Sequence, residues 1–236
     1  MFWRLIAMGW SAYGPALLRG KVAAAFLLLA APLWAGPVTV VALGDSLTQG
    51  YGLPREEGFV PRLQGWLDDR GVEAKIVNAG VSGDTTAGGA ARVDWSLTEE
   101  VDAMIVALGG NDMLRGIDPA VSRANLRDIL RAGRDHGVAM LLVGMEAPGN
   151  YGADYKAAFD AMYPELADRF GTLYHENFFK GLPTDEPQAM QAFFQPDGIH
   201  PNARGVARIV AAMGPKVRAL IERARQGDAD AIARLI

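Results

Sequence analysis

Three side chains that lie far apart in the sequence are of the types that ester hydrolysis through a covalent intermediate requires. Ser46 follows an apolar run within the motif Gly-Asp-Ser-Leu, where its hydroxyl would be exposed at the end of a strand. His200 is the one histidine of three that lies in a short polar motif, and Asp197 can reach its ring across a tight turn at Gly198. An imidazole held by a carboxylate can take the proton of a serine hydroxyl. We therefore predict Ser46 as nucleophile, His200 as base and Asp197 as the partner of the base.

The same reaction needs N–H donors that stabilise the negative oxygen formed in the transition state. Gly83 has no side chain, so its backbone N–H can approach a substrate closely. The Asn111 amide, which follows a later apolar run, supplies a second donor, and the Ser46 N–H would make a third. Gly80 lies three residues before Gly83 and could provide the backbone donor in its place, so both glycines stay candidates.

Each of these motifs also has a plain structural explanation. An Asp or Ser after a strand often caps a helix or forms a turn, and Asp-x-x-His can be a turn that leads into the helix after Pro201. A Gly-Gly-Asn-Asp segment is usually only a turn. Catalysis is the better interpretation because four such segments occur in one chain, each with a separate role in one reaction.

Short apolar runs alternate with amphipathic stretches, and these elements must position the four polar segments. Continuous apolarity of this kind is typical of strands that are covered on both faces. The runs are residues 38–43, 74–77, 103–108, 138–143 and, more weakly, 171–174. The alternation predicts an α/β fold with about five parallel strands and right-handed crossovers, in a three-layer α/β/α sandwich. Ligands of such sheets bind at the carboxyl ends of the strands, so the four segments are expected to meet at one edge.

The stretches between the runs have helical spacing. Apolar residues recur along one face between residues 155 and 170, and again between residues 206 and 221. Pro164 and Pro215 fall within these two patterns, and we expect them to kink or end the helices. No repeat or Gly/Ser linker divides the chain, which predicts a single domain over residues 36–236.

Composition excludes several classes of protein. The chain has 236 residues, of which 50% are hydrophobic and 21% charged, as in an ordinary globular protein. The absence of cysteine excludes disulfides, thiolate metal sites and a cysteine nucleophile. The formal charge is −4, and the sequence has no block of basic residues that could bind the phosphate backbone of a nucleic acid. We therefore predict no nucleic-acid partner. The sequence leaves the oligomeric state open.

Residues 1–35 have the order of features found in secretory signals. Arg4, Arg19 and Lys21 come first without any acidic residue, and the apolar run 23–35 then ends in alanine. We predict a signal peptide that is cleaved after Ala35, and hence an exported, periplasmic or secreted protein. An uncleaved N-terminal anchor is the alternative, although the run is shorter than the roughly 20 residues that span a bilayer. No stable membrane span is expected after cleavage.

The four polar segments resemble the conserved blocks of the GDSL or SGNH hydrolases, and they occur in the same order. The segments are Gly44-Asp45-Ser46-Leu47, Ser82-Gly83-Asp84-Thr85, Gly109-Gly110-Asn111-Asp112 and Asp197-Gly198-Ile199-His200-Pro201-Asn202. The flanking Gln49-Gly50-Tyr51-Gly52 and Asn150-Tyr151-Gly152 are similar to those of the thioesterase I and arylesterase subgroup.

This resemblance implies a flavodoxin-like fold without cofactor or metal. It also implies a catalytic triad of Ser46, Asp197 and His200, with an oxyanion hole made by Ser46, Gly83 and Asn111. In that subgroup the loop after the fourth strand lines the acyl site, which makes Pro148, Asn150 and Tyr151 candidate substrate-binding residues.

We therefore expect a serine hydrolase that acts on small-molecule acyl esters or thioesters, such as aryl esters, medium-chain acyl esters and lysophospholipids. A carbohydrate O-deacetylase would use the same groups with a more polar pocket. A non-catalytic flavodoxin-like module, whose Ser46 loop binds phosphate through N–H groups, is the alternative from another class. Hydrolysis by two metal ions is poorly supported, because the motifs offer too few histidine and aspartate ligands.

Other polar and aromatic residues are expected to be structural. His136 is predicted to end a helix, and His175 to cap an element or pair locally. Asp45 and Asp112 are expected to brace loops by hydrogen bonds to the backbone. Four aromatic residues before Asp197 could either form an acyl-binding wall or pack within the loop; they are Phe178, Phe179, Phe193 and Phe194.

Overall fold

The apolar runs form a sheet of five parallel strands in the computed structural model, which describes residues 36–183 and 186–233. The strands are β1 (Val38–Gly44), β2 (Ala74–Gly80), β3 (Ala103–Ala107), β4 (Ala139–Val143) and β5 (Leu173–His175). Their spatial order is β2-β1-β3-β4-β5. The predicted parallel α/β sheet is confirmed, and the predicted export segment 1–35 lies outside the described residues.

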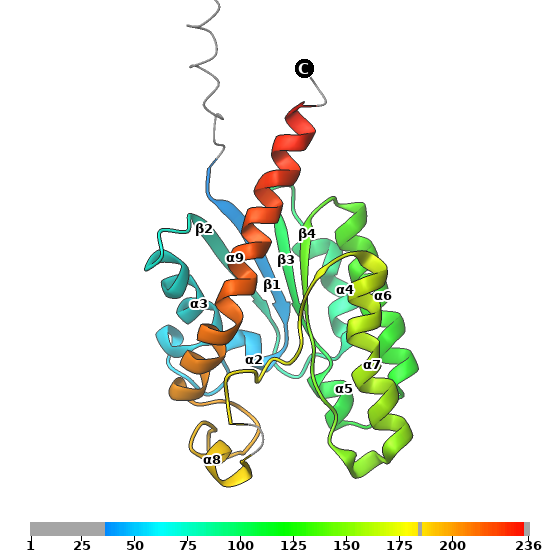
Figure 1. The fold of residues 1–236 in the computed structure, drawn as a ribbon. Helices are drawn as coiled ribbons and strands as arrows, with labels where there is room; N and C mark the ends of the chain where they lie inside the picture. Colours follow the sequence, from blue (N-terminus) through cyan, green and yellow to red (C-terminus); the bar gives the residue numbers. More distant parts are fainter. Residues whose placement is uncertain (1–35, 184–185, 234–236) are drawn as a thin grey trace, which may run out of the picture. The chain divides into compact units, whose positions relative to one another are not determined.

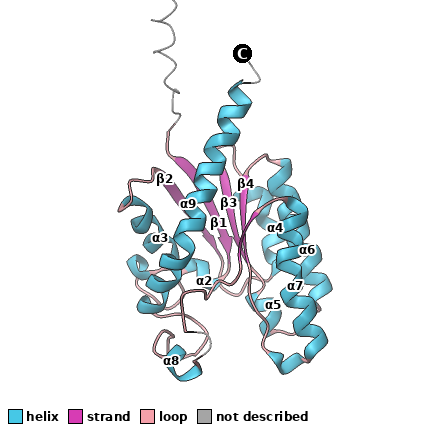
Figure 2. Cartoon of the chain, in the orientation of Figure 1, coloured by secondary structure: helices cyan, strands magenta, loops and turns pink. Residues whose placement is uncertain are grey.

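Helices cover both faces of the sheet, as expected when every strand returns by a crossover (Figures 1 and 2). One layer holds α3 and α9, and the other holds α4, α6 and α7. The long helices are α3 (Phe59–Asp68), α4 (Thr86–Ser96), α6 (Pro119–Asp135), α7 (Ala153–Phe170) and α9 (Ala203–Ala233). The short ones are α2 (Ser46–Gln49), η2 (Arg55–Glu57), α5 (Gly110–Leu114), η3 (Gly149–Tyr151) and α8 (Pro187–Gln191). The three-layer α/β/α sandwich is thereby confirmed.

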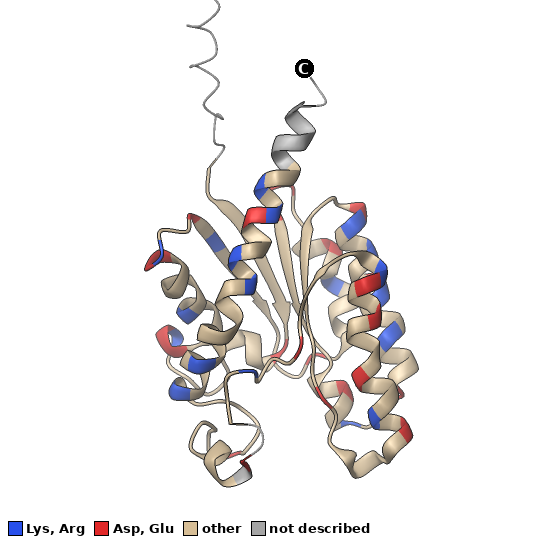
Figure 3. Ribbon diagram, viewed as in Figure 1, with Lys and Arg blue, Asp and Glu red and all other residues tan. Residues whose placement is uncertain are grey.

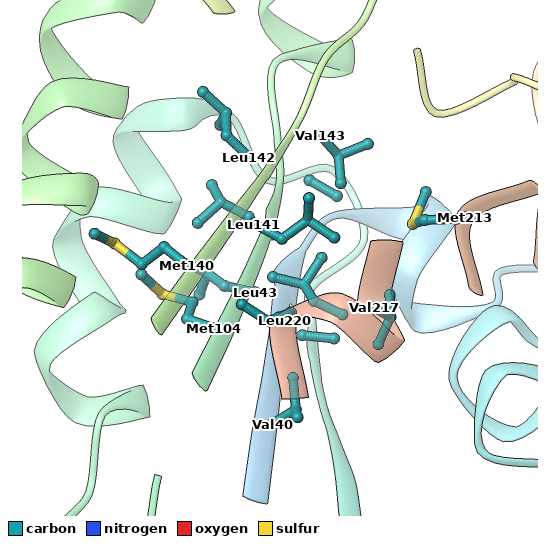
Figure 4. Close-up of a cluster of buried hydrophobic side chains, with 14 of the residues drawn as sticks. Val40, Leu43, Met104, Met140, Leu141, Leu142, Val143, Met213, Val217 and Leu220 are labelled. Atoms are coloured by element: carbon teal, nitrogen blue, oxygen red, sulfur yellow. The ribbon is translucent and has the colours of Figure 1, made fainter. Parts of the chain in front are cut away.

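The core lies where the strands meet the helical layers. Figure 4 shows Met213, Val217 and Leu220 of α9 among side chains of β1, β3 and β4. All three are buried, as are Val40 of β1 and Leu141 of β4. Burial of each such side chain stabilises the fold by about 1.5–3 kcal/mol. Helix α9 is therefore an integral part of the domain.

Two prolines lie inside helices that do not end there. Pro164 lies within α7 and Pro215 within α9, so the prediction that they could end these helices is wrong. A proline removes one helical hydrogen bond and is costly in an isolated helix. Here the flanking turns bury Tyr163, Met213 and Val217, and this packing outweighs the local cost.

Charged side chains gather on the helices and loops, and Lys75 of β2 is the one charged residue within the strands (Figure 3). Helices in the described part of the chain are all too short or too polar to cross a membrane.

The strands end in register at one edge, called here the carboxyl edge. Gly44 of β1 is paired with Gly80 of β2 and with Ala107 of β3, so the three strands finish side by side. The segments that follow them therefore leave the sheet next to one another. The opposite edge, where the strands begin, is called the amino edge.

Candidate active site

Ser46 is presented by a sharp turn between β1 and α2. Asp45 caps α2, since its carboxylate accepts the Leu47 N–H at 3.0 Å. Gly44 is required just before this turn, because a Cβ there would lie 2.0 Å from the Thr48 hydroxyl oxygen. The turn leaves the Ser46 N–H at the first position of the helix, where it has no partner within the helix.

The structure brings His200 and Asp197 to Ser46 from the other end of the sequence. His200 Nε2 lies 2.9 Å from Ser46 Oγ, and His200 Nδ1 lies 2.7 Å from Asp197 Oδ2. The second oxygen of Asp197 accepts the backbone N–H groups of Ile199 and His200, at 2.9 and 3.0 Å. Gly198 has a φ of +68°, a left-handed conformation that closes the turn between the two residues.

These hydrogen bonds stabilise the ionised form of Asp197. The His200 N–H, the His200 ring and the Ile199 N–H lower the pKa of Asp197 to about 2. The carboxylate is therefore ionised at neutral pH and accepts a proton-bearing Nδ1. Nε2 is then the free base that faces the Ser46 hydroxyl.

The choice between Gly80 and Gly83 follows from their hydrogen bonds. The Gly80 N–H already donates to Asn78 Oδ1 at 2.9 Å, and Gly80 lies within β2. Gly83 has a φ of +82°, and its N–H donates to no acceptor in the part of the chain that the structure describes. Gly83 is thus the available backbone donor of the two.

Asn111 is held by a carboxylate that adjoins the serine. Its Nδ2 donates one hydrogen to Asp45 Oδ2 at 3.3 Å, which leaves the second hydrogen of the same nitrogen for another acceptor. Burial raises the pKa of Asp45 to about 6, against the opposing effects of the Leu47 N–H and the Asn111 amide. An ionised Asp45 therefore selects the orientation in which Asn111 turns its nitrogen, rather than its oxygen, toward this corner.

A buried network joins the segments that carry Gly83 and Asn111. Asp112 accepts the Thr86 N–H at 2.8 Å, the Thr86 hydroxyl at 2.5 Å and the Ser122 hydroxyl at 2.9 Å. It thereby ties the first turn of α5 to the starts of α4 and α6. The prediction that Asp45 and Asp112 brace loops by backbone hydrogen bonds is confirmed.

Arg92 was not singled out from the sequence, yet it links three segments at this edge. Its guanidinium donates to the carbonyls of Gly44 and Ala79 at 2.9 and 2.8 Å, and to Asp84 Oδ2 at 2.7 Å. The ends of β1 and β2 and the segment of Gly83 are thus held together. Nothing in the spacing along α4 distinguishes this arginine, because all its partners come from other elements.

The loop after β4 also lies at the carboxyl edge. Pro148, Asn150 and Tyr151 are exposed there, around the short helix η3. The Tyr151 hydroxyl donates to the Leu114 carbonyl at 3.3 Å, so this loop contacts the segment that follows Asn111. A role of these three residues in substrate binding stays a prediction.

The remaining histidines differ from each other. His136 caps the end of α6, as predicted. The prediction that His175 caps or pairs locally is wrong, because the residue is 1% exposed and its Nε2 has no hydrogen-bond partner among the described residues. Burial lowers the pKa of His175 to about 4, so the ring is neutral at ordinary pH.

The four phenylalanines mainly pack within the domain. Phe178 and Phe193 are buried, and the ring of Phe178 contacts those of Phe59 and Phe179. Phe194 in turn contacts Phe179. Loop packing therefore explains these aromatic side chains better than an acyl-binding wall does.

No group of three or more His, Asp or Glu side chains within residues 36–183 and 186–233 could hold a metal ion. The groups that do converge are a hydroxyl, an imidazole, a carboxylate and unengaged N–H donors. Such an arrangement can transfer an acyl group from an ester to serine and then to water.

Comparison with known proteins points to the same chemistry. A family model described as GDSL-like lipase/acylhydrolase matches residues 42–208. Esterase TesA of Pseudomonas aeruginosa is 38% identical over 184 residues, which cover 78% of this chain and 89% of that protein. The Escherichia coli K12 protein named thioesterase 1/protease 1/lysophospholipase L1 is 35% identical, over 75% of this chain and 82% of its own. A crystal structure of TesA superposes with a TM-score of 0.71 at 37% identity, covering 77% of this chain and 99% of that one.

Proposed function

The chain belongs to the GDSL-like lipase/acylhydrolase family and is an ester-hydrolysing enzyme, and we propose that Ser46 is its nucleophile. One observation carries the assignment of the residues. A continuous line of hydrogen bonds runs from Ser46 Oγ through both nitrogens of His200 to Asp197 Oδ2, over 2.9 and 2.7 Å. Along this line a hydroxyl, an imidazole and a carboxylate follow one another, which is the order that a nucleophile, its base and an orienting carboxylate require.

The proposed reaction has two halves. Ser46 Oγ attacks the acyl carbon while His200 Nε2 takes the hydroxyl proton, and the leaving alcohol or thiol departs with that proton. A water molecule then attacks the acyl-enzyme, again with His200 as base, which releases the carboxylic acid and restores the serine. Throughout, Asp197 stabilises the imidazolium form of His200.

The oxygen of the substrate carbonyl becomes negative in both halves. The N–H groups of Ser46 and Gly83 and the free hydrogen of Asn111 Nδ2 are the proposed donors to it. They come from three segments that are held together by Arg92 and Asp112. Preorganised donors of this kind need no rearrangement when the charge forms.

We propose aryl esters, medium-chain acyl esters or thioesters, and lysophospholipids as the substrate class. Several large apolar side chains are exposed at the carboxyl edge, which suits a substrate with an apolar acyl or aryl part. These residues are Tyr51, Val81, Leu114, Tyr151 and Ile199, each between 44% and 53% exposed. The names of the two relatives, an esterase and a thioesterase/lysophospholipase, support esters, thioesters and lysophospholipids within this class. We also propose that Pro148, Asn150 and Tyr151 contact the acyl part.

Export is proposed from the composition of residues 1–35. Cations, an apolar run and a terminal alanine follow one another in the order of a signal peptide. N-terminal sequencing of the protein from the periplasm or the medium should begin at Gly36. Recovery with residues 1–35 intact in the membrane fraction would instead support the anchor.

The catalytic proposal is tested by covalent labelling. A fluorophosphonate should modify Ser46 of the wild type, located by mass spectrometry, and should not react with Ser46→Ala. Ser96→Ala is the matched control, because Ser96 ends α4 and its hydroxyl only donates to the Arg92 carbonyl at 3.1 Å. Labelling of Ser46→Ala at the wild-type rate would refute the assignment.

A substrate panel tests the range of esters. Aryl esters, acyl-CoA, lysophospholipid and an acetylated sugar should be compared at equal enzyme concentration, with and without EDTA. We expect hydrolysis of the first three classes and no effect of EDTA. A preference for the acetylated sugar would overturn the proposed substrate class.

A further inference from the structure

Tyr51 is hydrogen-bonded to the backbone of Ser46, the proposed nucleophile. Its N–H donates to the Ser46 carbonyl at 3.1 Å, just beyond the end of α2. Gly50, with a φ of +89°, turns the chain so that Tyr51 returns toward the serine. The position of Tyr51 is therefore linked directly to that of Ser46.

Gln195 connects the carbonyl of Tyr51 to the turn that carries His200. Its Nε2 donates to the Tyr51 carbonyl at 2.8 Å and to the Pro201 carbonyl at 3.1 Å, and its own N–H donates to the His200 carbonyl at 2.8 Å. Gly52 permits this approach, because a Cβ there would lie 2.1 Å from Gln195 Oε1. One glutamine thus joins two segments that are 144 residues apart.

The ring of Tyr51 contacts the ring of His200. Their centroids are 4.6 Å apart, and the planes are tilted by 38°. An aromatic face near a cation stabilises the positive charge, and in the proposed reaction His200 is positive in the transition state. The charged groups that act on His200 are Asp197 in its own turn and Asp45 beside Ser46.

We propose that Tyr51 and Gln195 are positioning residues that hold His200 against Ser46, and that the Tyr51 ring stabilises the imidazolium. This inference rests on the proposed roles of Ser46 and His200. The backbone contacts set the approach of base and nucleophile, which are 154 residues apart in the sequence. The ring limits the rotation of the imidazole and favours its charged form.

The chain offers a matched control in a second bridging glutamine. Gln64 of α3 donates through Nε2 to the Ala74 carbonyl at 2.9 Å, and its Oε1 accepts the Ile76 N–H at 2.9 Å. It joins α3 to the beginning of β2, away from the carboxyl edge. Replacement of Gln64 should therefore lower stability without changing the chemistry.

The experiment compares five variants with the wild type on a neutral aryl ester: Ser46→Ala, Tyr51→Leu, Tyr51→Phe, Gln195→Met and Gln64→Met. The measurements are kcat, KM, the pH–rate profile and the thermal midpoint. Tyr51→Leu should lower kcat about tenfold or more with little change in KM, because the backbone hydrogen bonds remain but the imidazole loses the ring that limits its rotation. The acid limb of the pH–rate profile of Tyr51→Leu should move to lower pH, because the imidazolium form of His200 has lost the aromatic ring that stabilises it.

The other variants separate the two contributions. Tyr51→Phe keeps the aromatic ring, so its kcat should fall much less than that of Tyr51→Leu, and the acid limb of its pH–rate profile should not move. Gln195→Met should lower kcat without moving the acid limb, and it carries the test if Tyr51→Leu does not fold. Gln64→Met should reduce the thermal midpoint while kcat and the profile stay unchanged.

Three results would overturn the inference. One is a Tyr51→Leu enzyme with wild-type kcat and profile, and another is a rise confined to KM, which would make the ring a wall of the substrate site. The third is an equal loss of kcat in Gln64→Met and Gln195→Met. Failure of the proposed function looks different, since Ser46→Ala would then hydrolyse the ester as fast as the wild type.

Discussion

The two edges of the sheet are built from the same strands and helices, yet they differ in which groups are left to act. At the amino edge a cavity of about 570 Å³ opens between the ends of α6 and α7 and the later part of α9. Arg223 there donates to the Gly171 carbonyl at 2.7 Å, and Arg134 lies 5.7 Å from the ring of Phe170. The arginines of this cavity are thus engaged with the protein itself.

The carboxyl edge has the opposite character, because the helices begin there. First-turn N–H groups have no partner within their helix and carry a partial positive charge, which suits an oxyanion. Ser46 starts α2 and Asn111 lies in the first turn of α5 (Figure 1). At the amino edge the helices end in carbonyls, which attract cations such as Arg223. The carboxyl edge therefore differs from the amino edge by its unengaged N–H donors beside the proposed nucleophile, and not by the volume of a cavity.

The largest expected effect belongs to Ser46 at the carboxyl edge. Ser46→Ala should lower kcat on an aryl ester on the order of 10⁴-fold or more while the circular dichroism spectrum stays that of the wild type. The hydroxyl is needed only for the covalent step, so the fold should tolerate its loss. A Ser46→Ala variant that keeps its activity would show that the reacting groups do not lie at the carboxyl edge as proposed.

Asn111→Ala should cost about 10²–10³ in kcat, with little change in KM. The amide is proposed to bind the oxyanion more strongly than the ground-state carbonyl, so its loss should affect the chemical step. Steady-state kinetics on esters of two acyl chain lengths measure the effects on kcat and on KM separately. If KM rises while kcat is retained, Asn111 positions the substrate and the set of donors must be redrawn.

Activity should fall as the pH is lowered from 8 to 5, because the proposed base His200 must be neutral to accept the Ser46 proton. Asp197 does not contribute to this loss, since its pKa of about 2 keeps it ionised throughout the range. The pH–rate profile of kcat/KM on a neutral ester is the measurement. A rate that is flat over this range would contradict a histidine base.

Asp45→Asn should slow the enzyme several-fold and stabilise it in mild alkali. The new amide no longer selects the orientation in which Asn111 presents its nitrogen, which weakens a proposed oxyanion donor. The folded pKa of Asp45 is raised to about 6, so its stabilising contribution is present at low pH and is lost as pH rises through 6.

Thermal midpoints of Asp45→Asn and wild type should therefore differ at pH 8, with the variant higher, and converge near pH 4. Equal midpoints of the two proteins at both pH values would show that ionisation of the buried Asp45 does not lower the stability of the fold. An unchanged kcat would show that Asn111 is oriented without it.

The smallest effect is expected at the amino edge. Arg223→Gln should lower stability by about 1 kcal/mol, which shifts the thermal midpoint of a domain of this size by roughly 2–4 °C. Its hydrogen bond to Gly171 closes the end of α7 and touches no reacting group, so kcat should not change. A loss of kcat comparable to that of Asn111→Ala would make the two edges equivalent.

Local patterns in the sequence were sufficient to predict the strands and the residues that converge at the carboxyl edge. Ser46, Asn111 and His200 each stand in a short motif after an apolar run or before a helix, and parallel topology then places those motifs together. Their catalytic roles remain to be tested by the variants above.

Residues whose partners are all distant could not be found in this way. Arg92 and Gln195 have no local signature, because each acts through carbonyls of other segments. His175 was misjudged for a related reason, since its surroundings in the core come from elements that are remote in sequence. The prolines of α7 and α9 do not end these helices, because tertiary packing outweighs the local preference.

Ser46 and His200 are separated by 154 residues, and this distance couples activity to the completion of folding. The proposed nucleophile follows β1, whereas the proposed base immediately precedes α9, which completes one helical layer of the sandwich. A growing chain that has not reached residue 197 holds the serine without the carboxylate and imidazole that contact it in the folded domain. Closure of so long a loop is a late, entropically costly event. Recovery of esterase activity during refolding should therefore lag behind the recovery of helical signal, and a ribosome-bound chain should stay inactive until the segment of His200 and α9 has docked.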